Sequence, residues 1–344
     1  MKILHVLRDL SRNGGVQRLV FDMANSKQAG LEISVLITNR ESGAEYIDEL
    51  RKNGVIVHLI PRWNLLAHFF LYRQFDIVHA HLFPALYLVG LLANKKVYTE
   101  HNTNNNRRNI PLARFIEYFI YKRFDSITCI TPEVKSSLLK FLKVEELSNT
   151  SVIYNGVDTA AFINENKNTR NDRYCNIAMI GSLTPKKDQE TIIKALTCLG
   201  DDCVLHLAGN GERKEELINL VSKLDVTNRV VFHGLIKDIP SFLSRMDIYV
   251  QSSKFEGFGL AAVEGMAANL PVLCSDVPGL AELTGSKDGL FTQGDYQQLA
   301  DCIERVNRDV GYKDLLLDMG RITSEKYSLV AMNENLYRLY EDLN

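Results

Sequence analysis

Two successive series of short apolar runs, separated by amphipathic stretches, constrain the fold of this chain more than any other feature. The first series occupies residues 3–7, 33–37, 55–60, 77–81, 97–101, 126–130 and 151–154. The second occupies residues 175–181, 203–209, 230–233, 248–251 and 272–275. Runs of this length between helical patterns predict buried strands. Their alternation with helices predicts an α/β fold with two doubly wound parallel sheets, each covered on both faces.

A polar linker divides the two series. It begins with the N-G-V-D segment at 155–158 and continues through residues 164–173, which are rich in asparagine, lysine and aspartate. The length of 344 residues also exceeds what one hydrophobic core usually organises. We therefore predict a first domain over residues 1–156, a second over 157–326 and a final helix over 327–344.

The composition is typical of a globular protein of the cytoplasm, with 46% apolar and 24% charged residues. The six cysteines lack C-x-x-C spacing, so we expect reduced thiols and neither a zinc site nor a redox pair. The longest apolar run, residues 82–93, contains Pro84 and is too short to span a bilayer. The amino terminus lacks the apolar region of a signal peptide. We therefore expect a cytoplasmic location.

Basic residues are concentrated in one part of the first domain. Residues 1–156 hold 20 basic and 14 acidic residues, and residues 95–143 alone hold 10 basic and 4 acidic ones. Arg107, Arg108 and the cations of residues 114–123 alternate with aromatic and aliphatic side chains. This pattern fits a peripheral contact with an anionic membrane, here the inner face of the plasma membrane, and equally a core-packed helix with basic ends. No nucleic-acid-binding motif accompanies it, so nucleic acid is not an expected partner.

The segment from Glu256 to Glu264 reads E-G-F-G-L-A-A-V-E and is the most informative motif of the chain. It follows an expected strand and enters a helix that we expect to begin at Phe258, so Gly257 and Gly259 lie where backbone can approach a ligand closely. Free amide groups at a helix start and the helix dipole favour a phosphate. Carboxylates around a bound phosphate indicate recognition of hydroxyl groups, as on a sugar and a ribose.

Loops after other expected strands supply further candidates. Gly14 and Gly15 stand between the first strand and the next helix, where a phosphate or a sugar can approach the backbone. Gly209 follows a strand and precedes a helix, as in a nucleotide-binding loop, but the third glycine of the G-x-G-x-x-G fingerprint is absent. His79 and His81 lie on one face of the fourth strand and are candidates for lining a site.

The segment around Glu256 resembles the E-x7-E motif of retaining glycosyltransferases with the GT-B fold, and the likeness to glycosyltransferase family 4 extends over nearly the whole chain. The resemblance implies two Rossmann-like domains that face each other across a cleft, with the last helix packed back on the first domain. It implies that Glu256 contacts hydroxyls of the donor sugar and that Glu264 holds the nucleotide ribose. The amides of the intervening turn, formed by Phe258, Gly259 and Leu260, would approach the phosphate and the sugar.

The same resemblance assigns roles outside the motif. Lys187 matches a lysine that offsets the diphosphate charge as the sugar leaves, with Lys186 as its substitute. His101, at the tip of the fifth strand, matches a histidine that faces the donor sugar and the acceptor. The loops at Gly209 and Gly234 would border the nucleotide base. The candidate catalytic residues are therefore Glu256, Lys187 and His101.

One position departs from the family pattern. Ser182 stands where many relatives carry an arginine, so one cation beside the diphosphate is missing. Either Arg18, Lys186 or another residue compensates, or stabilisation of the leaving group is weaker in this protein. Gly14 and Gly15 match the glycine-rich loop of the family near the diphosphate.

The resemblance therefore implies a retaining glycosyltransferase that moves a hexose or N-acetylhexosamine from a UDP-sugar, with a GDP-sugar as the alternative donor. The expected acceptor is a lipid-linked oligosaccharide of bacterial O-antigen or capsule synthesis. We expect no cofactor and no metal, because the D-x-D arrangement is absent and the eight histidines are not set at ligand spacing. Two alternatives remain: a UDP-sugar 2-epimerase of the same fold, and a catalytically silent sugar-nucleotide sensor, which is kept because of the departure at Ser182.

Overall fold

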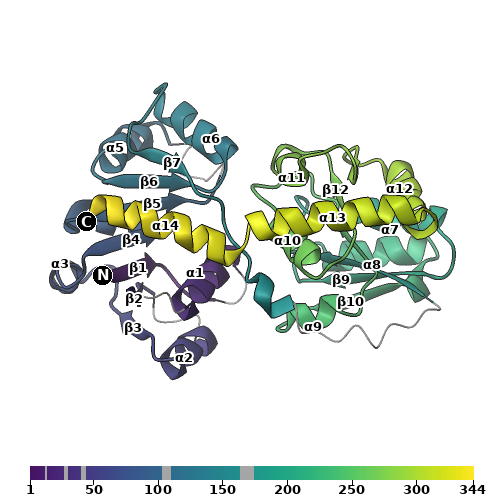
Figure 1. Cartoon of the computed structure of the whole chain (residues 1–344), viewed down its shortest axis with the longest axis horizontal. Helices are drawn as coiled ribbons and strands as arrows, with labels where there is room; N and C mark the ends of the chain where they lie inside the picture. The colour runs from purple at the N-terminus through teal and green to yellow at the C-terminus, as the bar shows by residue number, and fades with distance from the viewer. Residues whose placement is uncertain (12–13, 27–29, 40–43, 103–109, 163–173) are drawn as a thin grey trace. The chain divides into compact units, whose positions relative to one another are not determined.

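The computed structural model of the chain describes residues 1–11, 14–26, 30–39, 44–102, 110–162 and 174–344. The predicted linker residues 164–173, together with Arg107 and Arg108, lie outside the described residues. The chain divides into two compact units (Figure 1). Unit 1 comprises Met1–Gly156 and Leu329–Asn344, and unit 2 comprises Val157–Ser328.

Unit 1 is built on a seven-stranded parallel sheet of order β3-β2-β1-β4-β5-β6-β7. The strands are β1 (Lys2–Leu7), β2 (Glu32–Ile37), β3 (Ile56–Leu59), β4 (Ile77–His81), β5 (Lys96–Glu100), β6 (Ser126–Cys129) and β7 (Thr150–Val152). The order reverses between β1 and β4, and the carboxyl ends of the strands at such a switch point are where doubly wound sheets bind ligands.

Helices cover the sheet of unit 1 because the strands are apolar on both faces. These helices are α1 (Gly15–Asn25), α2 (Ala44–Lys52), α3 (Leu65–Tyr72), α4 (Ala85–Leu92), α5 (Pro111–Tyr121), α6 (Pro132–Leu142) and α14 (Leu329–Leu343). The C-terminal helix α14, drawn in yellow, lies across the strands (Figure 1). Its residues Leu336 and Tyr340 pack with Ile3 of β1 and Ile77 of β4 in one buried cluster. Burial of these side chains fixes the C-terminal helix to unit 1.

Unit 2 repeats the plan with a six-stranded parallel sheet of order β10-β9-β8-β11-β12-β13. The strands are β8 (Cys175–Ile180), β9 (Cys203–Ala208), β10 (Val230–Gly234), β11 (Ile248–Gln251), β12 (Val272–Ser275) and β13 (Leu290–Phe291). The helices are α7 (Gln189–Ala195), α8 (Lys214–Lys223), α9 (Ile239–Leu243), α10 (Leu260–Ala267), α11 (Pro278–Thr284), α12 (Tyr296–Arg308) and α13 (Val310–Lys326). The switch point of this sheet lies between β8 and β11.

The predicted fold class is confirmed, and each predicted strand overlaps an observed one. Helix α10 begins at Leu260 rather than Phe258, because Gly259 takes a φ of 94° as its N-cap. Helix α14 begins at Leu329, because Tyr327 ends α13 as its C-cap and Ser328 bridges to Val157. In the part of the chain that the structure describes, no helix combines the length and apolarity needed to cross a membrane.

Candidate functional site

The switch point of unit 2 brings two loops together, one after β8 and one after β11. Because β8 and β11 are neighbours in the sheet, their carboxyl ends meet at the same edge. The Ser252 hydroxyl donates to the backbone oxygen of Asp188 at 2.9 Å, and the Lys254 amide donates to the backbone oxygen of Lys186 at 2.8 Å. These bonds hold the two loops in one fixed arrangement.

Lys187 and Glu256 form an ion pair across the two loops. The lysine Nζ lies 2.5 Å from Oε2 of Glu256, and the two side chains are only 21% and 15% exposed. The aliphatic part of Lys187 lies over Gly181, where an added Cβ would sit 3.4 Å from its Cδ. The structure therefore brings together two of the three predicted catalytic residues, and it places a cation and an anion at the edge where doubly wound sheets generally bind ligands.

A chain of buried hydrogen bonds supports Glu256 from behind. The Tyr249 hydroxyl donates to Oε1 of Gln251 at 2.7 Å, and Nε2 of Gln251 donates to Oγ of Ser253 at 2.9 Å. The Ser253 hydroxyl in turn donates to Oε2 of Glu256 at 3.2 Å. Every donor in the chain points toward the carboxylate, so the bonds polarise one another in the same direction. This chain fixes the orientation of the Glu256 carboxylate.

The sequence analysis did not predict the residues of this hydrogen-bonded series behind Glu256. The signal was present, because Tyr249, Gln251 and Ser253 occupy alternate positions at the end of a buried strand and so lie on one face. Burial raises the pKa of Tyr249 well above its usual value, and the nearby carboxylates of Glu264 and Glu256 raise it further. The Tyr249 hydroxyl therefore keeps its proton and remains a hydrogen-bond donor.

The turn between Glu256 and α10 is shaped by its two glycines. Gly259 adopts a left-handed φ of 94° and caps α10 without any side-chain hydrogen bond, while a Cβ added to Gly257 would meet no atom within 4 Å. The Phe258 ring is buried and packs edge-on against Tyr327 with centroids 5.0 Å apart. Phe258 therefore anchors the turn through its ring, and Leu260 begins the helix with the backbone amides of its first turn at the loop edge.

The other candidate residues of unit 2 lie in different environments. Glu264 is buried on α10, whereas Lys186 and Ser182 are exposed. An added Cβ at Gly209 would lie 1.9 Å from the backbone oxygen of Gly181, so close packing against the β8 loop requires this glycine. The Gly209 amide donates to the backbone oxygen of Gly234 at 2.7 Å, which joins the loops after β9 and β10.

In unit 1, the predicted glycine pair lies at the start of α1. Gly14 is the N-cap, without a side-chain capping bond, and Gly15 is the first helical residue. A Cβ on Gly14 would lie 1.8 Å from Oε1 of Gln17, whose Nε2 donates to Oδ1 of Asp9 at 3.2 Å. The glycine therefore leaves room for a side-chain contact that ties the helix start to the loop after β1.

Four histidines form a buried network that runs from His5 in β1 through His79 and His81 in β4 to His101 just after β5. Nδ1 of His5 lies 2.9 Å from Nε2 of His81, and Nδ1 of His81 lies 3.2 Å from Nε2 of His101. His79 stacks on His81 with centroids 4.3 Å apart. Among the described residues, Nε2 of His5 and Nδ1 of His101 are buried without a hydrogen-bond partner. The predicted site residue His101 is thus one end of a relay, and His5 was missed because it lies far away in the sequence.

Burial holds this network in its neutral form. It lowers the pKa of His5 to about 4 and that of His101 to about 3. The pKa values of His79 and His81 fall well below the usual value through burial, reinforced by the charge that neighbouring histidines would carry. A neutral imidazole has one donor and one acceptor nitrogen. The hydrogen bonds along a row of neutral histidines must therefore all run in the same direction, either toward one end of the row or toward the other. The relay therefore couples the tautomer of His101 to those of His81 and His5.

Three of these histidines are also close enough to suggest a metal site. Ring nitrogens of His5, His79 and His81 lie within 4.8 Å of one another, which spacing along the sequence did not reveal. Both nitrogens of His79 are, however, hydrogen bonded, to Tyr340 at 2.5 Å and to Thr99 at 2.6 Å. Both nitrogens of His81 are likewise occupied. These bonds favour a hydrogen-bond network, and metal independence stays a prediction.

Acidification from pH 7 to pH 5 is expected to lower the free energy of unfolding. The histidine pKa values are lower in the folded state, so the unfolded chain binds more protons than the folded chain below pH about 6.5. The free energy of unfolding therefore falls as the pH is lowered, until the pH reaches the pKa values of the folded state. The contribution of each such histidine approaches a limit of about 1.4 kcal/mol per pH unit at lower pH, where the unfolded histidine is fully protonated, and is about half of this limit at pH 6.5. Urea unfolding at a series of pH values gives the free energy of unfolding as a function of pH. For the His5→Gln variant, this free energy should depend on pH less steeply than in the parent, by the contribution of one histidine. Equal slopes in variant and parent would contradict the assignment.

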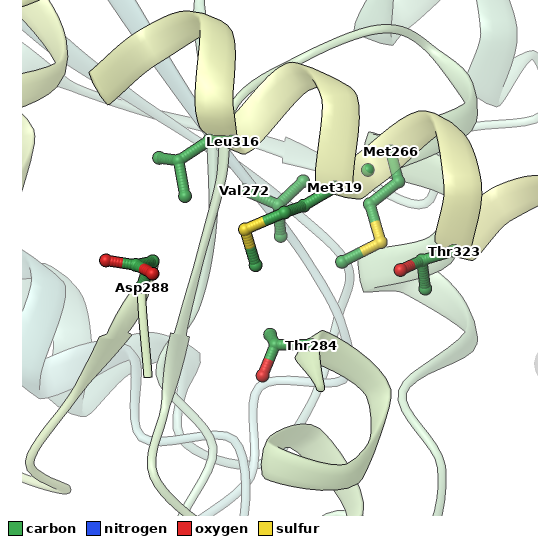
Figure 2. Close-up of a pocket in the computed structure, with 8 residues that line it drawn as sticks. Met266, Val272, Thr284, Asp288, Leu316, Met319 and Thr323 are labelled. Atoms are coloured by element: carbon green, nitrogen blue, oxygen red, sulfur yellow. The ribbon is translucent and has the colours of Figure 1, made fainter. Parts of the chain in front are cut away.

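A hollow under α13 lies apart from all predicted site residues (Figure 2). It is lined by Met266, Val272, Thr284, Asp288, Leu316, Met319, Gly320 and Thr323. The Thr284 hydroxyl donates to the backbone oxygen of Ala281 at 3.1 Å, and Asp288 accepts from Ser286 at 2.9 Å. Since these polar groups are already paired and most of the remaining wall is apolar, we interpret the hollow as a packing gap between α13 and its neighbours.

The chain is similar to known proteins along most of its length. Residues 162–322 match the family model of glycosyl transferases group 1, and residues 13–161 match that of glycosyltransferase family 4. An uncharacterised glycosyltransferase of Methanocaldococcus jannaschii is 25% identical over 307 residues, covering 87% of this chain and 84% of that protein. The UDP-Gal:alpha-D-GlcNAc-diphosphoundecaprenol alpha-1,3-galactosyltransferase of Escherichia coli is 26% identical over 310 residues, covering 83% and 79%. The crystal structure of Anabaena HepE in complex with UDP and glucose matches with a TM-score of 0.85 at 20% identity, covering 99% of each chain.

Proposed function

Because the chain belongs to glycosyltransferase family 4 and has the GT-B fold of two parallel-sheet α/β domains, we propose that it moves a hexose or N-acetylhexosamine from a UDP-sugar to an acceptor hydroxyl. We propose further that the anomeric configuration is retained and that no metal takes part. The UDP donor is supported by the solved Anabaena protein, whose crystal structures contain UDP or UDP-glucose.

The ion pair between Lys187 and Glu256 is the observation that carries the proposal. It lies at the switch point of unit 2, beside the start of α10, where the N-cap Gly259 provides no side-chain hydrogen bond. A diphosphate at this edge meets the Lys187 ammonium and the backbone amides of residues 257–260, while Glu256 accepts hydrogen bonds from sugar hydroxyls. The pair keeps both charges compensated, and a bound donor would become the partner of both groups.

In the proposed reaction the base is a group of the donor substrate and not a side chain of the protein. The departing β-phosphate takes the proton of the acceptor hydroxyl, while Lys187 and the amides of residues 257–260 stabilise the charge that develops on the leaving group. Glu256 orients the sugar and does not act as a nucleophile. Glu264 holds the ribose, and His101 contacts the donor sugar or the acceptor.

The acceptor is proposed to be a lipid-linked saccharide. Support comes from the Escherichia coli relative, whose name gives a diphosphoundecaprenol-linked GlcNAc as its acceptor. The basic residues of 95–143 are compatible with an acceptor held at an anionic membrane. Synthesis of an O-antigen or capsule is the process to which such a transfer would belong.

A ligand panel tests the proposed donor. A UDP-sugar that binds the folded chain is expected to raise its melting temperature, and a concentration of 100 times Kd corresponds to about 2.7 kcal/mol of added stability. The measurement is a thermal shift against UDP- and GDP-sugars, followed by transfer to a lipid-linked saccharide with the donor that gives the largest shift. A shift with GDP-sugars alone would contradict the UDP assignment.

The same panel separates the two alternatives. Release of an altered free sugar without any acceptor would identify a 2-epimerase. Binding of a UDP-sugar without turnover across a broad set of acceptors would identify a sensor, which the exposed Ser182 in place of a family arginine keeps under consideration.

A further inference from the structure

Helices α3, α4 and α5 of unit 1 present large apolar side chains to solvent. Trp63, immediately before α3, is 77% exposed and Leu66 is 72% exposed. Phe70, Leu91, Phe115 and Phe119 are also more than half exposed. We call the outward side of these three helices, together with Trp63, the apolar platform. Exposed apolar surface on this scale marks a contact with a membrane or with another protein.

The apolar platform is a continuous part of the fold. Helix α4 packs against both α3 and α5. The Tyr87 hydroxyl of α4 donates to Oε1 of Glu117 at 3.0 Å, and Nε of Arg123 donates to the backbone oxygen of Gly90 at 3.0 Å. The inward side of α3 is separately satisfied, because His68 is buried and lies 3.1 Å from the Tyr72 hydroxyl. The outward apolar residues therefore take no part in the packing of the core.

Within three residues of the ends of the three helices, every charged residue that the structure describes is basic, and the exposed Asp76 and Asp125 lie one position farther along the chain. Glu117 is the only acidic residue in the sequences of the three helices, and its side chain is fully buried. Arg62 and Arg73 flank α3, and Lys122 and Arg123 follow α5, all of them exposed. The Arg73 guanidinium lies 3.5 Å from the centroid of the Phe69 ring, which keeps a cation beside the apolar side chains. An apolar surface edged by cations is complementary to a bilayer of anionic phospholipid.

We infer that the apolar platform inserts into the interfacial region of an anionic phospholipid bilayer, with Trp63, Phe70 and Phe119 reaching the level of the acyl chains. The expected contact of residues 95–143 relied on basic charge, whereas this one depends on burial of apolar side chains and extends to α3, outside that range. The inference deepens the proposed function and rests on it only for the purpose of the contact, which is to bring unit 1 to a lipid-linked acceptor.

The chain carries its own probe for this inference. Trp63 is its single tryptophan, so tryptophan emission, excited at a wavelength that the 14 tyrosines do not absorb, reports on the apolar platform alone. Titration with vesicles of phosphatidylcholine and phosphatidylglycerol is expected to shift this emission to the blue, and lipids with brominated acyl chains should quench it. Binding is expected to weaken at high salt without disappearing, because insertion of apolar side chains is not screened. An unchanged emission, or complete release by salt, would overturn the inference.

Matched variants locate the contact. Phe70→Glu and Phe119→Glu should each weaken vesicle binding about tenfold or more, the partition expected for one large apolar side chain. Ile322→Glu is the control, since Ile322 is 60% exposed on α13 of unit 2 and should bind vesicles like the parent. Thermal unfolding verifies that each variant is folded. Equal binding by Phe70→Glu, Phe119→Glu and the parent would overturn the inference, as would a blue shift caused by protein concentration alone, which indicates a second copy of the chain.

Transfer to an acceptor without a lipid separates this inference from the proposed function. Phe70→Glu should transfer sugar to a short water-soluble acceptor at the parental rate, because the apolar platform then plays no part. Vesicle binding without any transfer by the parent would instead contradict the proposed function and leave the inference standing.

Discussion

Glu256→Ala is expected to lower kcat for sugar transfer by about two to three orders of magnitude, the usual cost of removing one charged or polar group from a reacting centre. The variant loses the carboxylate that the Tyr249–Gln251–Ser253 chain orients, so the donor sugar is no longer held in position. Folding should persist, because the Glu256 side chain lies at the partly exposed edge of the sheet and Lys187 can then take water as its partner. The measurement is transfer from the donor selected by thermal shift, with circular dichroism to verify folding.

Two comparisons sharpen this expectation. Glu264→Ala should chiefly raise KM for the donor, because Glu264 is assigned to the ribose rather than to the reacting sugar. Glu215→Gln, which removes an exposed carboxylate in the first turn of α8, should leave kcat and KM unchanged. Parental kcat in the Glu256→Ala variant would show that the pair between β8 and β11 is structural, and the site assignment would then be wrong.

Strand positions could be predicted from the sequence because a strand that is buried on both faces is a continuous run of uncharged, mostly apolar residues. Runs such as Ile248–Gln251 contain no charge, and the observed β11 has the same bounds. Strand β13 was missed because Leu290–Phe291 is too short to form a recognisable run. The start of α10 was misplaced by two residues because the positive φ of Gly259 and the packing of Phe258 on Tyr327 are tertiary features. The local sequence pattern therefore predicts which helices and strands form, whereas tertiary contacts determine the residues at which they begin and end.

The candidate site was predictable by residue type but not by contact. Lys187 and Glu256 are 69 positions apart, and nothing in the sequence states that they pair. His5 and His81 are 76 positions apart, so a search for local ligand spacing could not find their contact. In both cases neighbouring parallel strands bring distant residues together, and the order of the strands decides which residues meet. Strand order depends on the packing of the whole unit.

Lys187→Ala is expected to lower kcat about a hundredfold or more, because this ammonium is assigned to the charge that develops on the departing diphosphate. Lys187→Arg should recover part of the loss, since the positive charge returns with a different shape. The effect on stability should be small, about 1 kcal/mol, because the remaining Glu256 carboxylate is partly exposed and can be hydrated. The measurement combines steady-state kinetics of the two variants with urea unfolding.

Lys186→Ala is the matched control, because the two lysines are adjacent and only Lys187 is paired with Glu256. The exposed Lys186 side chain should be worth less than a factor of about five in kcat, in keeping with the weak effect of a solvated surface charge. If Lys186→Ala lost as much activity as Lys187→Ala, Lys186 would be the cation that compensates for the missing arginine at Ser182. If neither variant lost activity, the diphosphate would not be held at the switch point of unit 2, and the proposed mechanism would be wrong.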